Sequence, residues 1–186
     1  MKQFFLFLAI SFLLSSCYTT QSLANRVESK PVVLTKTLLT GLYENRVPDD
    51  LENSLWNDLC LHFPKKVHDV NEGNQVFLQY TEDDKVIAEL YQFGRLIDTM
   101  TLPGKPKDHY FRIRKGSHFF TLIVLTSKLS KKTILGNDAN GDLLLAQGWS
   151  SNTMFLENDT GQDEETVVAT YMRISDDRPA TTYFSD

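Results

Sequence analysis

Apolar and polar residues alternate along much of this chain, and the alternation is the feature that most constrains its fold. Two consecutive segments, 75–81 and 85–92, place apolar residues at every second position, and Asp83-Asp84 lies between them. A period of two is typical of a strand that buries one face, and two such strands joined by a short turn form a hairpin. The sequence therefore predicts β structure for the body of the chain.

Further strands are expected at spacings of about ten residues. The expected segments are 38–44, 95–102, 110–115, 119–126, 132–136, 143–149, 154–156 and 166–174. The stretch 103–106, Pro-Gly-Lys-Pro, is expected to break the chain because proline lacks a backbone N–H. About eight to ten antiparallel strands in consecutive hairpins form an all-β, up-and-down meander, which avoids exposed edges by closing into a barrel.

A single segment near residues 50–60 has the periodicity of a helix instead. Its leucines recur at four-residue spacing, which places them on one face. Asp49 or Asp50 can cap the first amides, and Pro64 stops the helix. The sequence predicts one short helix whose apolar face packs on the core; the alternative is that this face binds a partner.

The N-terminal residues have the features of a secretion signal that ends at a cysteine. Lys2 supplies a positive charge, and residues 4–14 are apolar except for Ser11. Eleven residues form about 17 Å of helix, which is too short to cross a hydrocarbon core of roughly 30 Å. The segment 14–17, Leu-Ser-Ser-Cys, resembles the bacterial lipobox. The alternative is an ordinary secretory peptide that precedes a cysteine.

The lipobox resemblance implies cleavage between Ser16 and Cys17 and attachment of acyl chains such as palmitate to Cys17. Two or three acyl chains hold a protein stably on a membrane, whereas one chain binds only marginally. No aspartate follows Cys17, and by the enterobacterial sorting rule this implies the outer membrane, with the protein facing the periplasm. The membrane is thus the first expected partner.

The chain divides into four parts by composition. Residues 1–16 are the expected signal peptide, and 17–32 are polar and are expected to form a flexible tether. Residues 33–175 form the expected β domain, and 176–186 form an expected disordered tail. Without residues 1–16 the chain has a net charge of −6, which argues against a nucleic-acid partner.

Five short segments occur in an order that resembles a known group of proteins; they are 40–45, 54–56, 107–113, 141–145 and 171–174. The group comprises uncharacterised lipoproteins of Bacteroides-type bacteria with lipocalin-like barrels. The resemblance spans most of residues 38–174, and it implies that the expected barrel has lipocalin-like form. True lipocalins carry Gly-x-Trp on the first strand, whereas Gly41-Leu42-Tyr43 has tyrosine here. A lipocalin ligand is therefore not carried over, and the group itself has no assigned activity.

The sequence contains no motif that indicates catalysis or a metal site. It has no Gly-x-Ser-x-Gly elbow, no phosphate-binding loop and no His-Glu-x-x-His. Asp138, Asn140 and Asp142 alternate as in a calcium loop, but Leu143 stands where an EF-hand needs glycine. A hairpin turn is the better interpretation of this segment. We expect no enzyme activity, no cofactor and no metal, and we expect Cys60 to be a buried apolar residue.

A barrel of about eight strands is wide enough for packed side chains or for one small ligand. The first expectation is a carrier of a small apolar or lipidic molecule inside the barrel. The residues expected to line its cavity are Tyr80, Val86, Ala88, Leu90, Asp98, Phe111 and Ile113. The alternative is a packed barrel that serves as a protein-interaction or structural module of the cell envelope, with an envelope protein as its partner.

Asp98 is included because it shares its face with apolar residues of the same strand. Leu96, Met100 and Leu102 have the same parity as Asp98 and are expected to face the core. A buried carboxylate is costly unless it is paired, so this position suggests contact with a ligand. The alternative is a β-bulge or a location at the mouth of the barrel.

Overall fold

The alternating segments form one antiparallel sheet. The computed structural model describes residues 20–47, 50–69, 73–114, 118–122, 125–155 and 158–180. Nine strands follow one path in the order β11-β10-β9-β7-β6-β5-β4-β1-β12, and β8 pairs with β9 beside this path. Most neighbours on the path are consecutive in the chain, and every pair is antiparallel, so the prediction of a mostly β chain with an antiparallel sheet is confirmed. The path begins at β11 and ends at β12, and the sheet is not closed.

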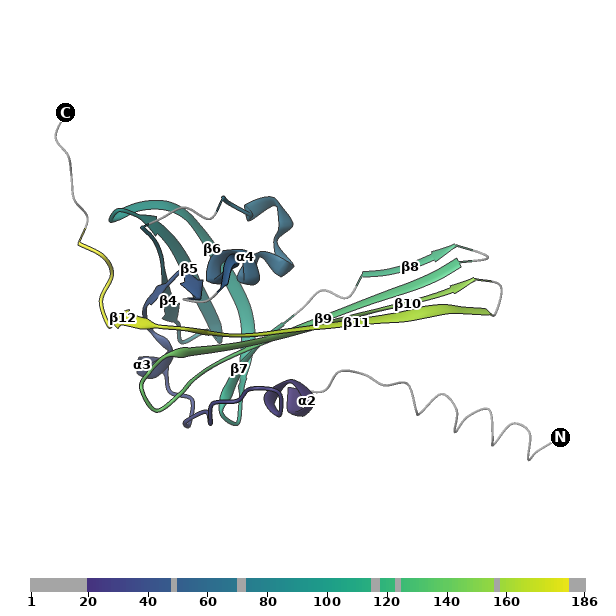
Figure 1. Ribbon diagram of the computed structural model, residues 1–186, viewed down its shortest axis with the longest axis horizontal. Helices are drawn as coiled ribbons and strands as arrows, with labels where there is room; N and C mark the ends of the chain where they lie inside the picture. The colour runs from purple at the N-terminus through teal and green to yellow at the C-terminus, as the bar shows by residue number, and fades with distance from the viewer. Residues whose placement is uncertain are drawn as a thin grey trace.

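The strands of the large sheet differ widely in length. They are β1 (Gly41–Glu44), β4 (Asn74–Tyr80), β5 (Lys85–Gln92), β6 (Arg95–Lys107), β7 (Tyr110–Ile113), β8 (His118–Leu122), β9 (Leu125–Asn137), β10 (Leu143–Phe155), β11 (Asn158–Tyr171) and β12 (Arg173–Ser175). The short strands β2 (Arg46–Val47) and β3 (Asp50–Ser54) form a separate two-stranded sheet. Figure 1 shows strongly curved strands at one end of the molecule and the long strands β9, β10 and β11 running out of it.

The predicted chain break at 103–106 is wrong, because β6 continues through it to Lys107. The strand changes partner there: Pro103 is the last residue paired with β5, and Gly104 is the first paired with β7. Gly104 donates its N–H to Asp84, and the carbonyl of Pro103 accepts from Arg114. Pro103, which has no N–H to donate, therefore lies where the ladder between β5 and β6 ends and the ladder between β6 and β7 begins.

Gly104 is required at this crossing for steric reasons. A Cβ atom at position 104 would overlap the ring of Phe111 and approach the carbonyl oxygen of Arg112 to 2.7 Å. The absence of a side chain lets β6 and β7 cross at close range and lets Phe111 enter the core.

The predicted helix near residues 50–60 exists but begins later. It is α4 (Leu55–Leu59), and residues 51–53, which were expected to be helical, belong to β3. The N-cap is Ser54, whose hydroxyl accepts from the N–H of Asn57 at 3.2 Å, so the role expected of Asp49 or Asp50 is filled by serine. Two short 3₁₀ turns follow, η1 (Cys60–His62) and η2 (Pro64–Lys66).

The short helix covers one end of the core, as the sequence predicts. Leu55, Trp56 and Leu59 are buried in the same hydrophobic cluster as the large sheet. The hydroxyl of Tyr171 on β11 donates to the Asp58 carboxylate at 2.5 Å, and this bond joins the helix to the sheet.

The polar segment before the domain lies against the sheet instead of forming a free tether. It contains α2 (Thr20–Ala24), and a second short helix, α3 (Lys36–Leu39), precedes β1. Leu23 is fully buried against Tyr110, Ile134 and Ala146, which lie on the opposite face of their strands from the core. The N–H of Val32 donates to the carbonyl of Asn137 at 2.9 Å. The expectation of a flexible tether therefore does not hold for residues 20–32.

Part of the segment expected to form a disordered tail also contacts the sheet. Arg178 binds the carboxylate of Glu89 through Nε at 2.8 Å and Nη2 at 3.0 Å, and its guanidinium lies 5.0 Å from the centre of the Phe77 ring. The end of the domain therefore lies beyond the expected limit at residue 175.

Cys17, which is expected to carry the lipid, and Ser16, which is expected to precede the cleavage site, lie outside the described residues, as do the rest of the expected signal peptide and positions 181–186. In the part of the chain that the structure describes, no helix is both long enough and apolar enough to span a membrane.

Candidate functional site

The apolar residues expected to line a ligand cavity are packed together in the main core. Five of them are between 0% and 3% exposed: Val86, Ala88, Leu90, Phe111 and Ile113. The ring of Tyr80 meets the ring of Phe111 edge-on, with 5.1 Å between the centroids. All six belong to one hydrophobic cluster that also contains residues of α4, β9, β10 and β11. Their side chains pack against one another on the inner face of the sheet.

Asp98 lies beside a β-bulge at the edge of this core. Leu90 of β5 pairs with Asp98, but its neighbour Tyr91 pairs with Leu96, so Ile97 is an extra residue in β6. The bulge leaves Leu96 exposed instead of facing the core, whereas Met100 and Leu102 are buried as expected. A β-bulge at Asp98 is the alternative that the sequence pattern left open, beside contact with a ligand.

The Asp98 carboxylate is bound by groups of η2 and the residues just after it. Lys66 Nζ lies 2.6 Å from Oδ1, His68 Nε2 lies 3.1 Å from Oδ2, and the N–H of Thr99 donates to Oδ1 at 2.7 Å. Partial burial raises the pKa of Asp98, but the hydrogen bonds from Lys66, His68 and Thr99 outweigh this effect and hold the pKa below its usual value. The carboxylate therefore has hydrogen-bond partners within the protein itself, and one of them is the ammonium group of Lys66.

The sequence pattern did not indicate a role for Lys66. Its carbonyl oxygen nevertheless accepts hydrogen bonds from side chains of α4 and η1, and so joins both of these elements to η2. The indole N–H of Trp56 donates to it at 2.7 Å, and the thiol of Cys60 donates to it at 3.2 Å. Burial, followed by the nearby Asp98 charge, raises the pKa of Cys60 to about 12, so the thiol stays protonated at neutral pH. Cys60 is buried and unreactive in character, as the sequence predicts.

A second polar cluster lies where the first and last strands of the sheet meet. Nη1 of Arg173 donates to the carbonyl of Leu38 at 2.5 Å and to the hydroxyl of Tyr43 at 3.0 Å, and Nη2 donates to the carbonyl of Thr40 at 2.5 Å. The guanidinium also lies 5.5 Å from the centre of the Tyr43 ring. A Cβ at Gly41 would come within 2.8 Å of this guanidinium, so the Gly41-x-Tyr43 pattern reflects the space that Arg173 occupies.

Tyr43 is held as a neutral phenol within this cluster. Its hydroxyl donates to the carbonyl of Leu39 at 3.2 Å and accepts from Nδ2 of Asn137 at 3.0 Å. Burial is the largest influence and raises the pKa of Tyr43 to about 12, although Arg173 and Asn137 act in the opposite direction. The cluster thus binds α3, β1, β9 and β12 to one another.

The segment 138–142 forms the predicted hairpin turn. Oδ1 of Asp138 accepts from the N–H groups of Asn140 and Asp142 at 2.9 and 3.0 Å, and Gly141 has a φ of 90°. These bonds satisfy the turn without an ion. No group of three or more His, Cys, Asp or Glu side chains that could hold a metal occurs among the described residues.

Four strands extend beyond the core cluster as a projecting arm. We define the arm as residues 118–122 of β8, 125–131 of β9, 149–155 of β10 and 158–165 of β11 (Figure 1). The pairing is continuous out to Leu125 with Phe155, about 20 Å beyond Lys131 at the usual rise per strand residue. Among the described strands, none pairs with the outer side of β8 or of the β11 part of the arm.

The two faces of the arm differ in sequence. Leu135 and Leu145 are core residues, so the two-residue period assigns one arm face to the same side as the core. This core-side face carries residues of both kinds. Six are apolar, Phe120, Leu122, Leu125, Leu129, Trp149 and Phe155, and the polar ones include His118, Ser127, Lys131, Ser151, Thr153, Asp163 and Glu165. The other face is mostly polar, with Thr126, Lys128, Ser130, Ser150 and Asn152 among its residues. The sequence predicted the strands but not that they leave the body of the domain.

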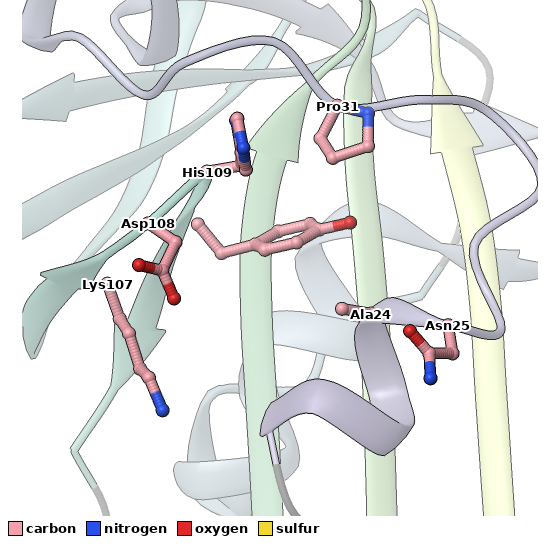
Figure 2. Close-up of a pocket in the computed structure, with 7 residues that line it drawn as sticks. Ala24, Asn25, Pro31, Lys107, Asp108 and His109 are labelled. Carbon is pink, nitrogen blue, oxygen red and sulfur yellow. The ribbon is translucent and has the colours of Figure 1, made fainter.

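Two surface pockets lie away from the predicted lining residues. The first has a volume of about 210 Å³ and lies between the N-terminal segment and the β6–β7 turn; Figure 2 shows Lys107 and Asp108 on one side and Ala24 and Asn25 on the other. The second has a volume of about 380 Å³ and is lined by residues 26–29, Val47 and residues 167–170.

Replacement of Asp98 by asparagine is expected to lower the free energy of unfolding by about 1 kcal/mol at pH 7, because a partly exposed ion pair contributes little more. The pKa of Asp98 is depressed in the folded state, so its contribution is present above the unfolded value of about 3.9 and is lost as the pH falls through the folded value. Urea unfolding of wild type and Asp98→Asn at pH 7 and near pH 3 should show this difference shrinking.

The matched control for Asp98 is Asp83→Asn. Asp83 pairs with Lys85 at 3.4 Å but its side chain is 78% exposed, so its replacement should change stability less at either pH. A difference for Asp98→Asn that is the same at both pH values would contradict the assigned ion pairs.

Replacement of Arg173 by lysine is expected to lower the free energy of unfolding by about 2 kcal/mol. A single ammonium cannot reproduce the fork of donors that reaches the carbonyls of Leu38 and Thr40 together. Arg178→Lys is the control, because Arg178 binds Glu89 at an exposed site and should lose less than about 1 kcal/mol. If both variants lose the same free energy of unfolding in urea, the hydrogen bonds of Arg173 stabilise the fold no more than the exposed ion pair of Arg178 does.

Comparison of the chain with models of protein families, with curated proteins and with solved structures found no match. The function is therefore argued from the geometry of the protein alone.

Proposed function

We propose that this protein is a lipid-anchored, non-catalytic component of the cell envelope that binds another envelope protein through its arm. The observation that carries the proposal is the arm itself, a four-stranded extension in which β8 and β11 have no strand paired to their outer edges among the described strands. An unpaired strand edge presents a row of free N–H and C=O groups to which a strand of another protein can pair. Anchoring at Cys17 in the outer membrane, with the domain in the periplasm, completes the proposal.

The shape proposed for the domain is a lipocalin-like barrel, and the last strands support it. Only Met172 separates β11 from β12, and its carbonyl accepts from the N–H of Glu44 at 2.9 Å. Tyr171 pairs with Leu143 at one end of the strand path, and Arg173 pairs with Tyr43 at the other. One nearly continuous strand that pairs at both ends of a sheet is the arrangement that closes a barrel.

Packing of the core favours a structural role for the barrel over ligand transport. A carrier needs unfilled volume inside, whereas Val86, Ala88 and Leu90 are at most 1% exposed and belong to the same cluster as residues from α4 and β10. Small barrels can be filled entirely by their own side chains. The proposed role of the core is therefore to hold the arm in position.

Overpacking at Ala88 distinguishes a filled interior from a hollow one. In a filled interior, Ala88→Leu should lower the free energy of unfolding by about 1–3 kcal/mol, because three added carbons have no space. In a hollow interior the same change should be neutral or stabilising, because it buries apolar surface in empty volume. Urea unfolding gives the answer, and Ile87→Leu on the opposite face of the same strand is the control, expected to change stability by less than about 1.5 kcal/mol.

Site-specific photocrosslinking in intact cells tests the arm as the binding surface. A photoreactive residue at Thr121 or Gln162 in the full-length protein should give a discrete crosslinked product, because these positions lie in β8 and β11, the two edge strands of the arm. The same residue at Asp83, in the exposed β4–β5 turn, is the control and should give none. Equal products from Asp83 and the arm positions, or none from the arm, would contradict the proposal.

A further inference from the structure

The two outer edges of the arm can pair with each other when they come from different copies of the chain. β8 forms one edge and the 158–165 part of β11 forms the other, and no described strand pairs with the outer side of either. Each of the four arm strands is antiparallel to the next, so β8 and β11 run in opposite directions. In two copies that point the same way, the β8 edge of one and the β11 edge of the other therefore meet as antiparallel strands and continue the sheet.

Charge is divided between the two sides of the arm. The segment 109–137, which contains β8 and β9, has six lysine and arginine residues and no acidic residue. The segment 149–172, which contains the arm part of β10 and all of β11, has five acidic residues and no lysine or arginine. The basic residues are Arg112, Arg114, Lys115, Lys128, Lys131 and Lys132, and the acidic residues are Glu157, Asp159, Asp163, Glu164 and Glu165. The β8 side of the arm is therefore basic in sequence, and the β11 side is acidic.

The strand register brings the two kinds of charge to the same level of the arm. His118 on β8 pairs with Leu129, and Leu129 pairs with Ser151. Ser151 in turn pairs with Asp163 on β11. His118 and Asp163 are therefore level with each other and share one face, because paired residues of adjacent strands lie on the same face of a sheet. Two copies side by side, without a shift along the arm, place the histidine of one opposite the aspartate of the next.

We infer that the arm binds a second copy of this chain, with the β8 edge of one copy paired to the β11 edge of the next. The inference rests on the proposed function for the arm as the binding surface, and it names the partner. Pairing of β11 with β11 would place the acidic residues of both copies on adjacent strands, where like charges repel. Pairing of β8 with β11 joins the basic side to the acidic side instead.

Such pairing uses two different surfaces of each copy, so it is heterologous. Every copy that is bound through β8 still has a free β11 edge, and the copies add into a row or a closed ring. All copies in the row point the same way, and copies anchored in one membrane share this direction. β8 has only five residues, so the pairing is short and gains most from the high effective concentration at a membrane surface.

Crosslinking between two tagged forms of the full chain tests the pairing. One form carries Thr121→Cys and the other carries Gln162→Cys; both positions lie on the same face of the arm, about 7 Å apart along β10 by register. With both forms in the same vesicles, a bismaleimide should give a product that contains both tags. Its yield should exceed that of either form alone by about tenfold or more, because heterologous pairing brings β8 only to β11. The wild-type chain, in which Cys60 is buried, is the blank.

The remaining outcomes of this experiment separate the inference from the proposed function. Absence of the two-tag product overturns the inference, and so does an equal yield from either form alone, which would show symmetric pairing. Photocrosslinking in intact cells decides the proposed function independently. A photocrosslinked product with a different protein, and no two-tag product, would leave the proposed function standing without this inference. Absence of both kinds of product would contradict both.

Charge reversal tests whether the two edges attract each other. Asp163→Lys in the Gln162→Cys form should lower the two-tag product by about threefold or more, because a lysine would then face the basic side of the next copy. His118→Asp in the Thr121→Cys form should restore the product. The two changes are in different molecules, so restoration cannot come from the folding of one chain. His109→Asp, at an exposed position in the β6–β7 turn, is the matched control and should not restore it. Equal results for the two aspartate variants would overturn the inference.

Discussion

The guanidinium of Arg173 is the group on which the arrangement of the sheet depends. It reaches the carbonyls of Leu38 and Thr40, the hydroxyl of Tyr43 and the carboxylate of Asp176, so one side chain joins the last strand to the segment that starts the first. Such charge-assisted bonds to buried acceptors are stronger than neutral ones. They hold together residues more than 130 positions apart in the chain. Without them, β12 would be held on β1 by only two residue pairs of the strand ladder.

Under the proposed function, stability and recognition belong to two different parts of the same strands. Near their paired ends, β9, β10 and β11 contribute Leu135, Leu145 and Tyr171 to the buried cluster. Further out, the same strands pair only with one another and with β8. Substitutions in the arm are therefore less constrained by the core, because none of the arm's described side chains belongs to the buried cluster. A binding surface can change in sequence there while the body keeps its fold.

Local sequence patterns predicted most strands but not the features that depend on distant partners. The segment 85–92 matches β5 because alternation and turn residues are both local signals. The break expected at 103–106 is absent because β6 exchanges β5 for β7 there, which depends on where two other strands lie. Leu23 is one apolar residue in a polar segment, so no periodicity shows that it is buried.

The candidate sites were harder to predict for the same reason. Alternation placed Asp98 beside Met100 and Leu102 correctly, but it could not show the extra residue at Ile97 or the partners Lys66 and His68, which are about 30 positions away. The pocket at Tyr110 depends on a contact between the N-terminal segment and the β6–β7 turn. The projection of the arm depends on where the core ends, and alternation continues past that point.

Burial of Leu23 sets how far such a protein can reach from a membrane. Leu23 follows Cys17 by six positions, and six residues span at most about 20 Å. In a chain anchored at Cys17, the linker between the lipid and the domain is therefore short, and the domain stays within about one protein diameter of the lipid surface. Its encounters become a search in two dimensions: molecules that share the same bilayer surface are met at high effective concentration, and those across the compartment are out of range.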